Sequence, residues 1–369
     1  MSSLPAKTVV IGMSGGVDSS VAALLLKQQG YRVIGLFMRN WDENDPSGNC
    51  QASVDYDDVV RVCKQIDIPH YAVDFTKEYW DQVFAHFLDE YRAGHTPNPD
   101  ILCNREIKFK VLLDKAFELG ADFLATGHYV QKRQAGEECQ LLRGADQGKD
   151  QSYFLYAIDH SALEKSLYPI GHLPKAEVRR IAAEHGLATS EKKDSTGICF
   201  IGERNFKEFL SNYIAAQPGE FVTLDGDVVG KHDGIAYYTI GQRRGMGIGG
   251  PGDAWFVVGK DIPNNRVIVA QGSEHPALFC DELTATEITW ISPKGAPSVP
   301  FTCTARVRYR QPDQPCTITT IDDDRMHVVF HVPQRAVTPR QSVVFYDGDV
   351  CLGGAVIEKA GPSHYDQKK

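Results

Sequence analysis

The stretch Thr8-Val9-Val10-Ile11-Gly12-Met13-Ser14-Gly15-Gly16-Val17-Asp18-Ser19-Ser20 decides the fold of the first half of the chain. Its apolar start is typical of a buried strand, and the residues from Val17 onward follow a helical pattern that Gly30 ends. A glycine- and serine-rich turn between a buried strand and a helix offers backbone N–H groups and hydroxyls at the positive end of the helix dipole. The stretch therefore predicts a cradle for phosphate groups.

The same turn excludes one familiar kind of phosphate site. It lacks the Lys-Ser or Lys-Thr pair that ends a Walker P-loop and grips a transferred γ-phosphate. Its glycines and hydroxyls fit a leaving pyrophosphate better. The alternative interpretation is an ordinary strand-to-helix turn.

Buried strand patterns alternate with amphipathic helix patterns over the first two hundred residues. Strands separated by helices indicate an α/β fold with a parallel, doubly wound sheet. The expected strands cover residues 8–13, 33–38, 70–75 and 122–126, and the expected helices cover 17–29, 54–66, 78–91 and 105–119.

The second half of the chain has a different pattern, with many glycines and short alternating strands. The change begins near Gln217-Pro218-Gly219, and a second break lies at residues 292–297. The regularly spaced strands after it predict a small C-terminal β-barrel. We expect three domains, an α/β domain that carries the phosphate cradle (1–210), a β-rich central domain (211–293) and the barrel (294–369). The expected strands cover residues 236–240, 255–258, 267–270, 301–309, 316–321, 326–330 and 342–346.

The composition is that of an ordinary globular protein. The 369 residues carry a net charge of −9, which argues against a generally basic nucleic-acid coat protein but leaves room for a local basic patch. No apolar run approaches the roughly 18–20 residues of a membrane helix, and the N-terminus leads into a strand pattern without room for a signal peptide. We expect a cytoplasmic protein with no membrane partner. A monomer is expected because no coiled-coil pattern or apolar interface stripe is present.

Two of the nine cysteines lie in a polar, loop-like context. No two cysteines have C-x-x-C spacing, so no resident metal site is predicted. Cys103 precedes the expected helix at Arg105, where a helix N-terminus and nearby cations would lower the pKa of its thiol. Cys199 follows a pair of lysines. Each cysteine alone is adequately explained by packing, but together they are candidate reactive thiols.

Several motifs stand out along the chain: SGGVDSS (14–20), TPNPDILCN (96–104), ATGHY (125–129), KDQSY (149–153), DSTGICFIGER (194–204), GQRRG (241–245), RYRQ (308–311) and TPRQS (338–342). They resemble those of the bacterial tRNA-specific 2-thiouridylases, a family of PP-loop ATP pyrophosphatases, and the resemblance runs nearly end to end. Arg340 departs from it, because the family usually has glycine before the glutamine. The resemblance implies that residues 1–210 are a PP-loop, ATP-binding catalytic domain and that residues 211–293 contact RNA.

The resemblance implies sulfur insertion at C2 of the wobble uridine, position 34, of tRNA. AMP would be transferred from ATP to the C2 oxygen with release of pyrophosphate, and a persulfide on Cys199 would carry the sulfur. Cys103 would be the second thiol and either attacks the activated carbon or forms a disulfide with Cys199. Asp100 would act as general acid and base.

The resemblance also implies two sets of binding residues. ATP, with Mg²⁺ on its phosphates, would lie against Gly12, Met13, Ser14, Gly15, Gly16, Val17, Asp18, Ser19, Met38 and Gly127. The tRNA anticodon region would contact Asn98, Pro99 and Asp100 around the target base, and His128, Lys149, Asp150, Gln151, Arg310, Gln311 and Gln341 elsewhere. A separate sulfur-donor protein would load the persulfide.

Charge gives partial independent support for an RNA partner. Residues 294–345 hold seven basic and four acidic side chains, a net charge of +3. These residues predict either a face that follows phosphates or an ordinary solvated strand face. The glycine-rich run 245–252 with Arg243 and Arg244 fits a lid, an RNA-binding loop or a hairpin.

Two other classes of protein share some of these features. A PP-loop ligase that amidates carboxylic acids would need an ammonia supply and has no use for two loop cysteines. A non-catalytic RNA-binding protein has no use for an intact Ser14–Ser20 loop. We therefore predict a thiolating enzyme.

Overall fold

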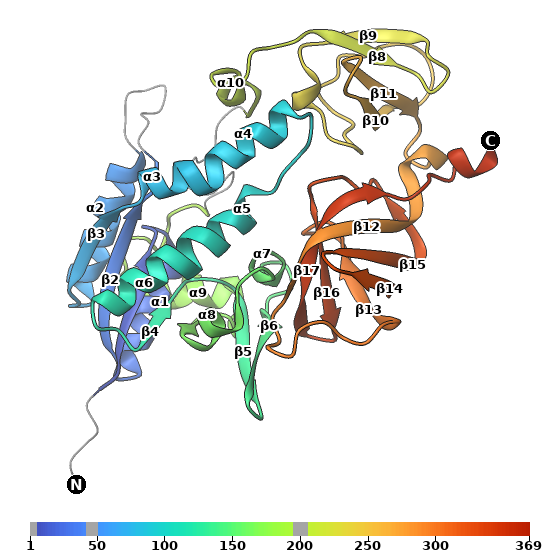
Figure 1. Cartoon of the computed structure of the whole chain (residues 1–369). Helices are drawn as coiled ribbons and strands as arrows, with labels where there is room; N and C mark the ends of the chain where they lie inside the picture. The colour runs from blue at the N-terminus through green and yellow to red at the C-terminus, as the bar shows by residue number, and fades with distance from the viewer. Residues whose placement is uncertain (1–5, 42–50, 195–205) are drawn as a thin grey trace.

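The computed structural model describes residues 6–41, 51–194 and 206–369. Figure 1 shows a sheet with its helices at the left, a barrel at the lower right and a smaller sheet above the barrel. None of the helices within these ranges is long and apolar enough to cross a membrane.

A five-stranded parallel sheet organises the first part of the chain, as predicted. Its order is β3-β2-β1-β4-β7, and every neighbouring pair is parallel. Side chains alternate along β1, so that Val9 and Ile11 enter one core and Val10 enters the other. The strands are β1 (Thr8–Met13), β2 (Arg32–Arg39), β3 (His70–Asp74), β4 (Phe123–Ala125) and β7 (Ser166–Leu167).

Helices cover both faces of this sheet and complete the doubly wound arrangement. One face packs against α1 (Val17–Gln28), α2 (Gln51–Gln65) and α9 (Lys175–Glu184). The other face packs against two long helical runs. The first run consists of α3 (Thr76–Tyr79), π-helix η1 (Trp80–Phe84) and α4 (Ala85–Arg92). The second run consists of α5 (Pro99–Leu102), π-helix η2 (Cys103–Val111) and α6 (Leu112–Glu118). Three short helices, α7 (Ser152–Leu155), α8 (His160–Glu164) and α10 (Phe206–Ser211), lie in the connections.

The central part of the chain forms a four-stranded sheet, in the order β10-β11-β8-β9. The predicted strand at 236–240 is wrong, because Ile235–Tyr237 form the 3₁₀ turn η3. The apolar residues there turn over the sheet rather than extend it, and Tyr238 packs edge-on against Phe221. The strands are β8 (Gly219–Val222), β9 (Val228–His232), β10 (Trp255–Asp261) and β11 (Arg266–Gln271).

The C-terminal part is a closed six-stranded barrel, as predicted, since β12 pairs with β17 as well as with β15. The sequence did not indicate the hairpin of β5 (Val130–Ala135) and β6 (Glu138–Arg143), which leaves the parallel-sheet region and pairs with β17. The barrel strands are β12 (Phe279–Trp290), β13 (Phe301–Arg306), β14 (Gln314–Asp322), β15 (Arg325–Arg335), β16 (Ser342–Asp347) and β17 (Val350–Ala360), and η4 (Pro276–Leu278) and η5 (Asp366–Lys368) are 3₁₀ turns.

Candidate functional site

The loop between β1 and α1 is held by hydrogen bonds within itself. The Ser19 hydroxyl accepts from the Ser14 N–H at 3.2 Å and donates to the Gly16 carbonyl at 3.2 Å. The Ser14 and Ser19 hydroxyl oxygens lie 3.2 Å apart. These contacts place hydroxyls and backbone donors together at the start of α1, which is the donor set that a polyphosphate requires.

Two glycines let neighbouring backbone approach this loop. Gly15 has a φ of +72°, and a Cβ there would lie 2.5 Å from the carbonyl oxygen of Asp55. A Cβ on Gly127, which follows β4, would lie 2.8 Å from the amide nitrogen of Ser19. Because real side chains do not tolerate these approaches to backbone atoms, both positions require glycine. Gly127 therefore adjoins the phosphate-binding loop, where the resemblance placed it.

Asp18 is the charged centre of the loop. Its carboxylate accepts from the Tyr129 hydroxyl at 2.7 Å and from the Lys175 ammonium at 2.7 and 2.8 Å. Lys175 also lies 2.8 Å from Asp194. Burial and the nearby Asp18 carboxylate raise the pKa of Tyr129. The Tyr129 hydroxyl therefore stays protonated and donates a hydrogen bond to Asp18.

The sequence did not single out Lys175. It is 9% exposed, lies at the start of α9 and stands 157 residues from Asp18 along the chain. Neither periodicity nor any of the phosphate motifs marked it, and only the folded arrangement brings it to the loop. Its ammonium adds positive charge to a loop that otherwise offers neutral donors.

The remaining predicted nucleotide residues lie close by on the same sheet. Gly12 and Met13 end β1, and Val17 begins α1. Met38 lies near the end of β2, beside Val73 of β3, and is 8% exposed.

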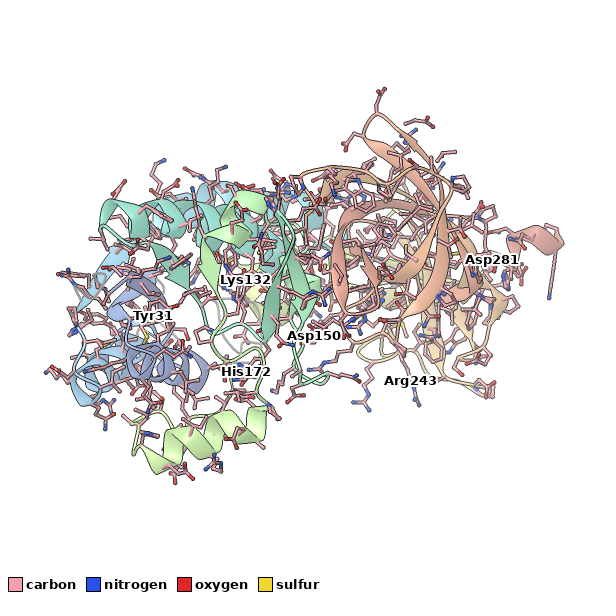
Figure 2. The ribbon with its side chains drawn as sticks, turned by 90° about the horizontal axis from the view of Figure 1, so that it is seen from below. Tyr31, Lys132, Asp150, His172, Arg243 and Asp281 are labelled. Carbon is pink, nitrogen blue, oxygen red and sulfur yellow. The ribbon has the colours of Figure 1, made fainter. Side chains whose placement is uncertain are left out.

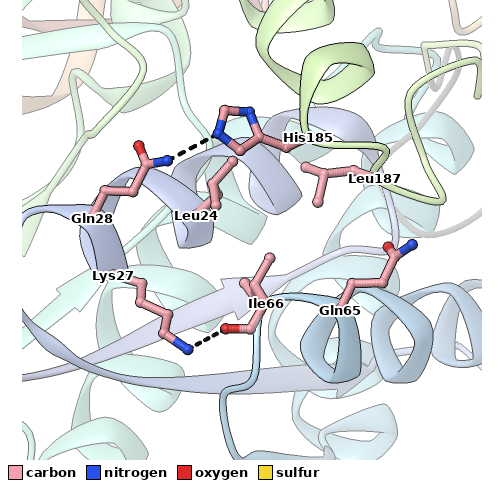
Figure 3. Close-up of a pocket in the computed structure, with 7 residues that line it drawn as sticks. All are labelled: Leu24, Lys27, Gln28, Gln65, Ile66, His185 and Leu187. Atoms are coloured by element: carbon pink, nitrogen blue, oxygen red, sulfur yellow. Dashed lines mark hydrogen bonds between the residues drawn. The ribbon is translucent and has the colours of Figure 1, made fainter.

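A hollow on this half of the molecule lies away from the phosphate-binding loop. A space of about 390 Å³ is found at the other end of α1, lined by Leu24, Lys27, Gln28, Gln65, Ile66, His185 and Leu187 (Figure 3). It gathers the C-terminal ends of α1, α2 and α9, whose carbonyls disfavour phosphate. It is therefore not part of the nucleotide site.

Cys103 is fully buried in the helical run that packs against β1. The run begins at Pro99 with Asn98 as its N-cap, and not at Arg105 as predicted. Cys103 consequently lies in its second turn, at the first residue of a π-helix, rather than at a helix N-terminus. A Cβ on Gly12 would lie 3.3 Å from Leu112, nine residues beyond Cys103 in the same run, so this later part of the run adjoins the end of β1.

The cations expected beside Cys103 have other partners. Arg105 pairs with Glu106 at 2.7 Å, and Lys108 donates to the Asn104 side chain at 2.9 Å. Asp100 lies one turn before Cys103, with its N–H donated to the Asn98 side chain at 3.2 Å. Cys199, the other predicted thiol, lies outside the described residues.

His128 lies beneath the helix that carries Cys103. The imidazole is 8% exposed, 2.8 Å from the Thr126 hydroxyl through Nδ1 and 5.8 Å from the Phe109 ring. Burial and the nearby Lys108 ammonium hold its pKa well below the usual range. The ring is therefore neutral and faces protein, whereas the resemblance makes it a tRNA contact.

The segment Lys149-Asp150-Gln151 connects the nucleotide region to the barrel. Lys149 pairs with Asp194 at 2.6 Å, and Gln151 accepts from the Tyr129 N–H at 2.9 Å. Asp150 is 3% exposed and accepts from the Ser152 N–H and hydroxyl. Figure 2 shows it where the two halves of the molecule meet.

Asp150 belongs to a closed ring of four charges. Arg143 pairs with Asp313 at 2.7 Å and lies 3.7 Å from Asp150, and Arg306 pairs with Asp313 at 2.7 Å and with Asp150 at 3.4 Å. The Arg143 guanidinium also stacks 3.6 Å from the centre of the Tyr346 ring. With both carboxylates of the ring facing arginines, Asp150 joins the β5–β6 hairpin to the barrel in this structure rather than facing solvent.

Most basic side chains of the barrel have partners within the protein. Arg308 donates to three oxygens, those of Ile240, Ala336 and Thr338, and Arg340 pairs with two glutamates. Gln311 and Gln341 also bond to protein groups, Gln334 and the Thr96 carbonyl. Arg310 is exposed. The net charge of residues 294–345 therefore overstates the basic surface that RNA would meet.

The fold and the loop together define a class, an α/β protein that binds a nucleotide through a self-supported phosphate loop and carries a closed β-barrel. Three family models match successive parts of the chain. They are the tRNA methyl transferase HUP domain over residues 7–203, the tRNA methyl transferase PRC-barrel domain over 207–271, and the aminomethyltransferase β-barrel domain over 280–357.

Full-length relatives give a more specific assignment. The chain is 61% identical to the tRNA-specific 2-thiouridylase MnmA of Protochlamydia amoebophila, over 98% of this chain and 96% of that one. It is 60% identical to the protein of that name in Geobacillus thermodenitrificans, over 97% of each. The chain belongs to the tRNA-specific 2-thiouridylase family.

Solved structures resemble the chain only distantly. The U34-tRNA thiolase NcsA of Methanococcus maripaludis is 20% identical with a TM-score of 0.36, over 56% of this chain and 64% of that one. A 4-thiouridine synthetase in complex with RNA and ATP is 18% identical with a TM-score of 0.34, over 56% of this chain and 50% of that one.

Proposed function

We propose that this chain makes 2-thiouridine at the wobble position of tRNA in two half-reactions, each with its own set of residues. That the chain is an ATP-using tRNA-uridine 2-sulfurtransferase follows from its family, because relatives of that name are about 60% identical over nearly its whole length. The observation that supports the residue-level proposal is that one continuous helical run carries Asp100 and Cys103 at its start and packs through Leu112 against Gly12, near the end of β1 from which the phosphate-binding loop leaves.

The activation half-reaction uses the loop between β1 and α1. The C2 oxygen of the uracil attacks the α-phosphorus of ATP, the bond to pyrophosphate breaks, and AMP stays on the oxygen. Ser14, Ser19 and the backbone N–H groups would hold the phosphates, and Lys175 would stabilise the leaving pyrophosphate. Asp18 is the carboxylate that would hold Mg²⁺, which neutralises phosphate charge when bound.

The sulfur-transfer half-reaction uses Asp100, Cys103 and Cys199. The terminal sulfur of a Cys199 persulfide attacks C2, and AMP leaves with the former C2 oxygen. Cys103 thiolate then attacks the Cys199 sulfur, the S–S bond breaks, and its electron pair stays on the transferred sulfur. The products are the thiocarbonyl and a Cys103–Cys199 disulfide, which a thiol reductant must reopen.

Asp100 would accept and return the uracil proton that moves during these two half-reactions. The uracil loses its N3 proton when its C2 oxygen is adenylated, and regains one when the thiocarbonyl forms. A carboxylate one helical turn before Cys103 is suitably placed to accept and return it.

The rest of the proposal concerns partners and organisation. We propose a monomeric cytoplasmic enzyme loaded by a separate sulfur-donor protein, with a first domain boundary near residue 210. The second boundary, expected at residue 293, lies before β12 instead, because that strand belongs to the barrel. The side chains proposed to face tRNA are Asn98, Pro99, His128, Lys149, Asp150, Gln151, Arg310, Gln311 and Gln341. For His128, Asp150, Gln311 and Gln341 this requires a change from their present protein contacts when tRNA binds.

The test separates the two half-reactions. Wild type, Cys103→Ser and Cys199→Ser are incubated with ATP, Mg²⁺, a persulfide donor and unmodified tRNA, and both AMP and 2-thiouridine are measured. Cys139→Ser is the matched control, because Cys139 is also buried but lies in the β5–β6 hairpin. We expect AMP from all four proteins but 2-thiouridine from wild type and the control only.

Several outcomes would contradict parts of the scheme. Normal 2-thiouridine from either active-site variant removes the two-thiol mechanism. A covalent tRNA adduct that requires Cys103 indicates that this thiol attacks C2 itself. Loss of AMP formation in Cys103→Ser places the thiol in the activation step instead.

A further inference from the structure

The segment Gly94–Asn98 joins α4 to the helix that carries Asp100 and Cys103. Gly94, with a φ of +78°, ends α4 by donating its N–H to the Tyr91 carbonyl at 3.0 Å. Asn98 begins the next helix as its N-cap. The position of this short segment therefore sets where the Asp100 helix starts.

The central sheet holds one end of this segment. The Lys260 ammonium of β10 donates to the Gly94 carbonyl at 2.6 Å, and the Thr239 and Thr96 hydroxyl oxygens lie 3.2 Å apart. Burial lowers the pKa of Lys260 to about 8. A Cβ on Gly94 would lie 3.1 Å from Ile262, so the central sheet also packs closely here.

The barrel holds the middle of the same segment. The Gln341 amide donates to the Thr96 carbonyl at 2.6 Å. Its neighbour Arg340 lies 2.8 Å from Glu90 of α4, and Glu90 in turn lies 2.7 Å from His95. Arg340 has a φ of +67°, a conformation that costs a non-glycine residue roughly 1–2 kcal/mol. Its ion pairs with Glu90 and Glu287 offset that cost.

Two carbonyls of one short segment thus accept side-chain donors from two different sheets. The half-buried Lys260 ammonium has exchanged part of its water shell for a bond that fixes the Gly94 carbonyl. We propose that Lys260 is a positioning residue for sulfur transfer, which holds Gly94 so that Asp100 and Cys103 meet the activated base. This inference rests on the function proposed above.

The test compares Lys260→Met with Lys132→Met. Lys132 is the matched control, because its ammonium also donates to a backbone carbonyl at a helix end, that of Glu164, at 2.9 Å. We measure kcat and KM for tRNA thiolation, the Kd for ATP, and amide hydrogen exchange of residues 94–104. Lys260→Arg, which keeps a donor, serves as the conservative rescue.

We expect Lys260→Met to lower kcat about 10-fold, as loss of one charged hydrogen bond allows. The KM for tRNA and the Kd for ATP should change less than about 2-fold, and Lys260→Arg should recover most of kcat. Exchange at residues 94–104 should accelerate about 10-fold.

The proposal is overturned if Lys260→Met resembles Lys132→Met in kcat and in exchange. A rise in KM for tRNA alone in Lys260→Met overturns the positioning role and makes Lys260 an RNA contact. If wild type makes no 2-thiouridine, the proposed function fails, and hydrogen exchange still decides whether Lys260 holds the segment.

Discussion

The phosphate-binding loop and the segment Gly94–Asn98 are both short connections to a functional helix, but they are stabilised in opposite ways. The turn of the loop is held by bonds between residues five apart or fewer, such as Ser14 to Ser19, and the distant partners of Asp18, which are Tyr129 and Lys175, lie in the same domain. Gly94–Asn98 is held by side chains 143 to 245 residues away, Thr239, Lys260 and Gln341. A locally built site is complete in one domain, whereas a site built at long range depends on the barrel and the central sheet.

The largest expected effect comes from a substitution that displaces the phosphate-binding loop. Gly127→Ala places a methyl group 2.8 Å from the Ser19 amide nitrogen, and because backbone atoms cannot move aside the loop must shift. We expect a loss of about 1000-fold in AMP formation, or ~4 kcal/mol of transition-state stabilisation, with thiolation lost in parallel. Rates of AMP and 2-thiouridine formation check this.

The control for this variant is Gly120→Ala. Gly120 also has a positive φ, +80°, but no atom lies within 4 Å of a Cβ built there. It should lower the Tm through backbone strain and leave AMP formation unchanged. Equal losses of activity in both variants would mean that general destabilisation, and not the approach to the loop, is responsible.

The next effect breaks a long-range connection. Asp150→Asn removes one carboxylate from the ring of Arg143, Arg306 and Asp313, and leaves arginines buried with too little negative charge. Breaking such a buried pair costs about 3 kcal/mol. We expect that loss in urea unfolding of the full chain, together with reduced thiolation and an unchanged Kd for ATP.

Arg325→Gln is the control for the ring, because Arg325 forms an exposed pair with Glu358 on the same barrel. It should change the unfolding free energy by less than about 1 kcal/mol. A loss of ATP affinity in Asp150→Asn would show that the nucleotide site also depends on the barrel, and the contrast between the two regions would then fail.

This contrast explains what the sequence could predict. β1, the loop and α1 follow from one continuous pattern, and the barrel follows from strands spaced along the chain. Lys175 and the β5–β6 hairpin acquire their places through partners more than 150 residues distant, which no local pattern encodes. The helix start was misplaced at Arg105 because Pro99 followed by Asp100 resembles a turn, although proline is also suited to the first turn of a helix.

The smallest expected effect concerns His128, which lies between the two regions, after Gly127 and beneath the helix of Cys103. Its pKa is lowered by burial and by Lys108, so the folded protein leaves the ring neutral where the unfolded chain, with a pKa near 6.5, takes up a proton. Above pH 6.5 neither state is protonated and stability is unaffected. Below it the unfolded state gains the proton, so stability falls as pH falls, by at most about 1.4 kcal/mol per pH unit.

His128→Gln should remove this part of the acid sensitivity. Between pH 6.5 and 5.5, wild type is expected to lose about 1 kcal/mol more unfolding free energy than His128→Gln, measured by urea unfolding at each pH. Thr126→Val is the control, since it removes the hydroxyl 2.8 Å from Nδ1 but keeps the imidazole, and it should retain the wild-type slope. If His128→Gln keeps that slope as well, another group causes the loss of unfolding free energy at low pH. A slope lost only when tRNA is bound would instead indicate that the imidazole leaves its buried place to meet RNA, and the helix of Cys103 would then have to move with it.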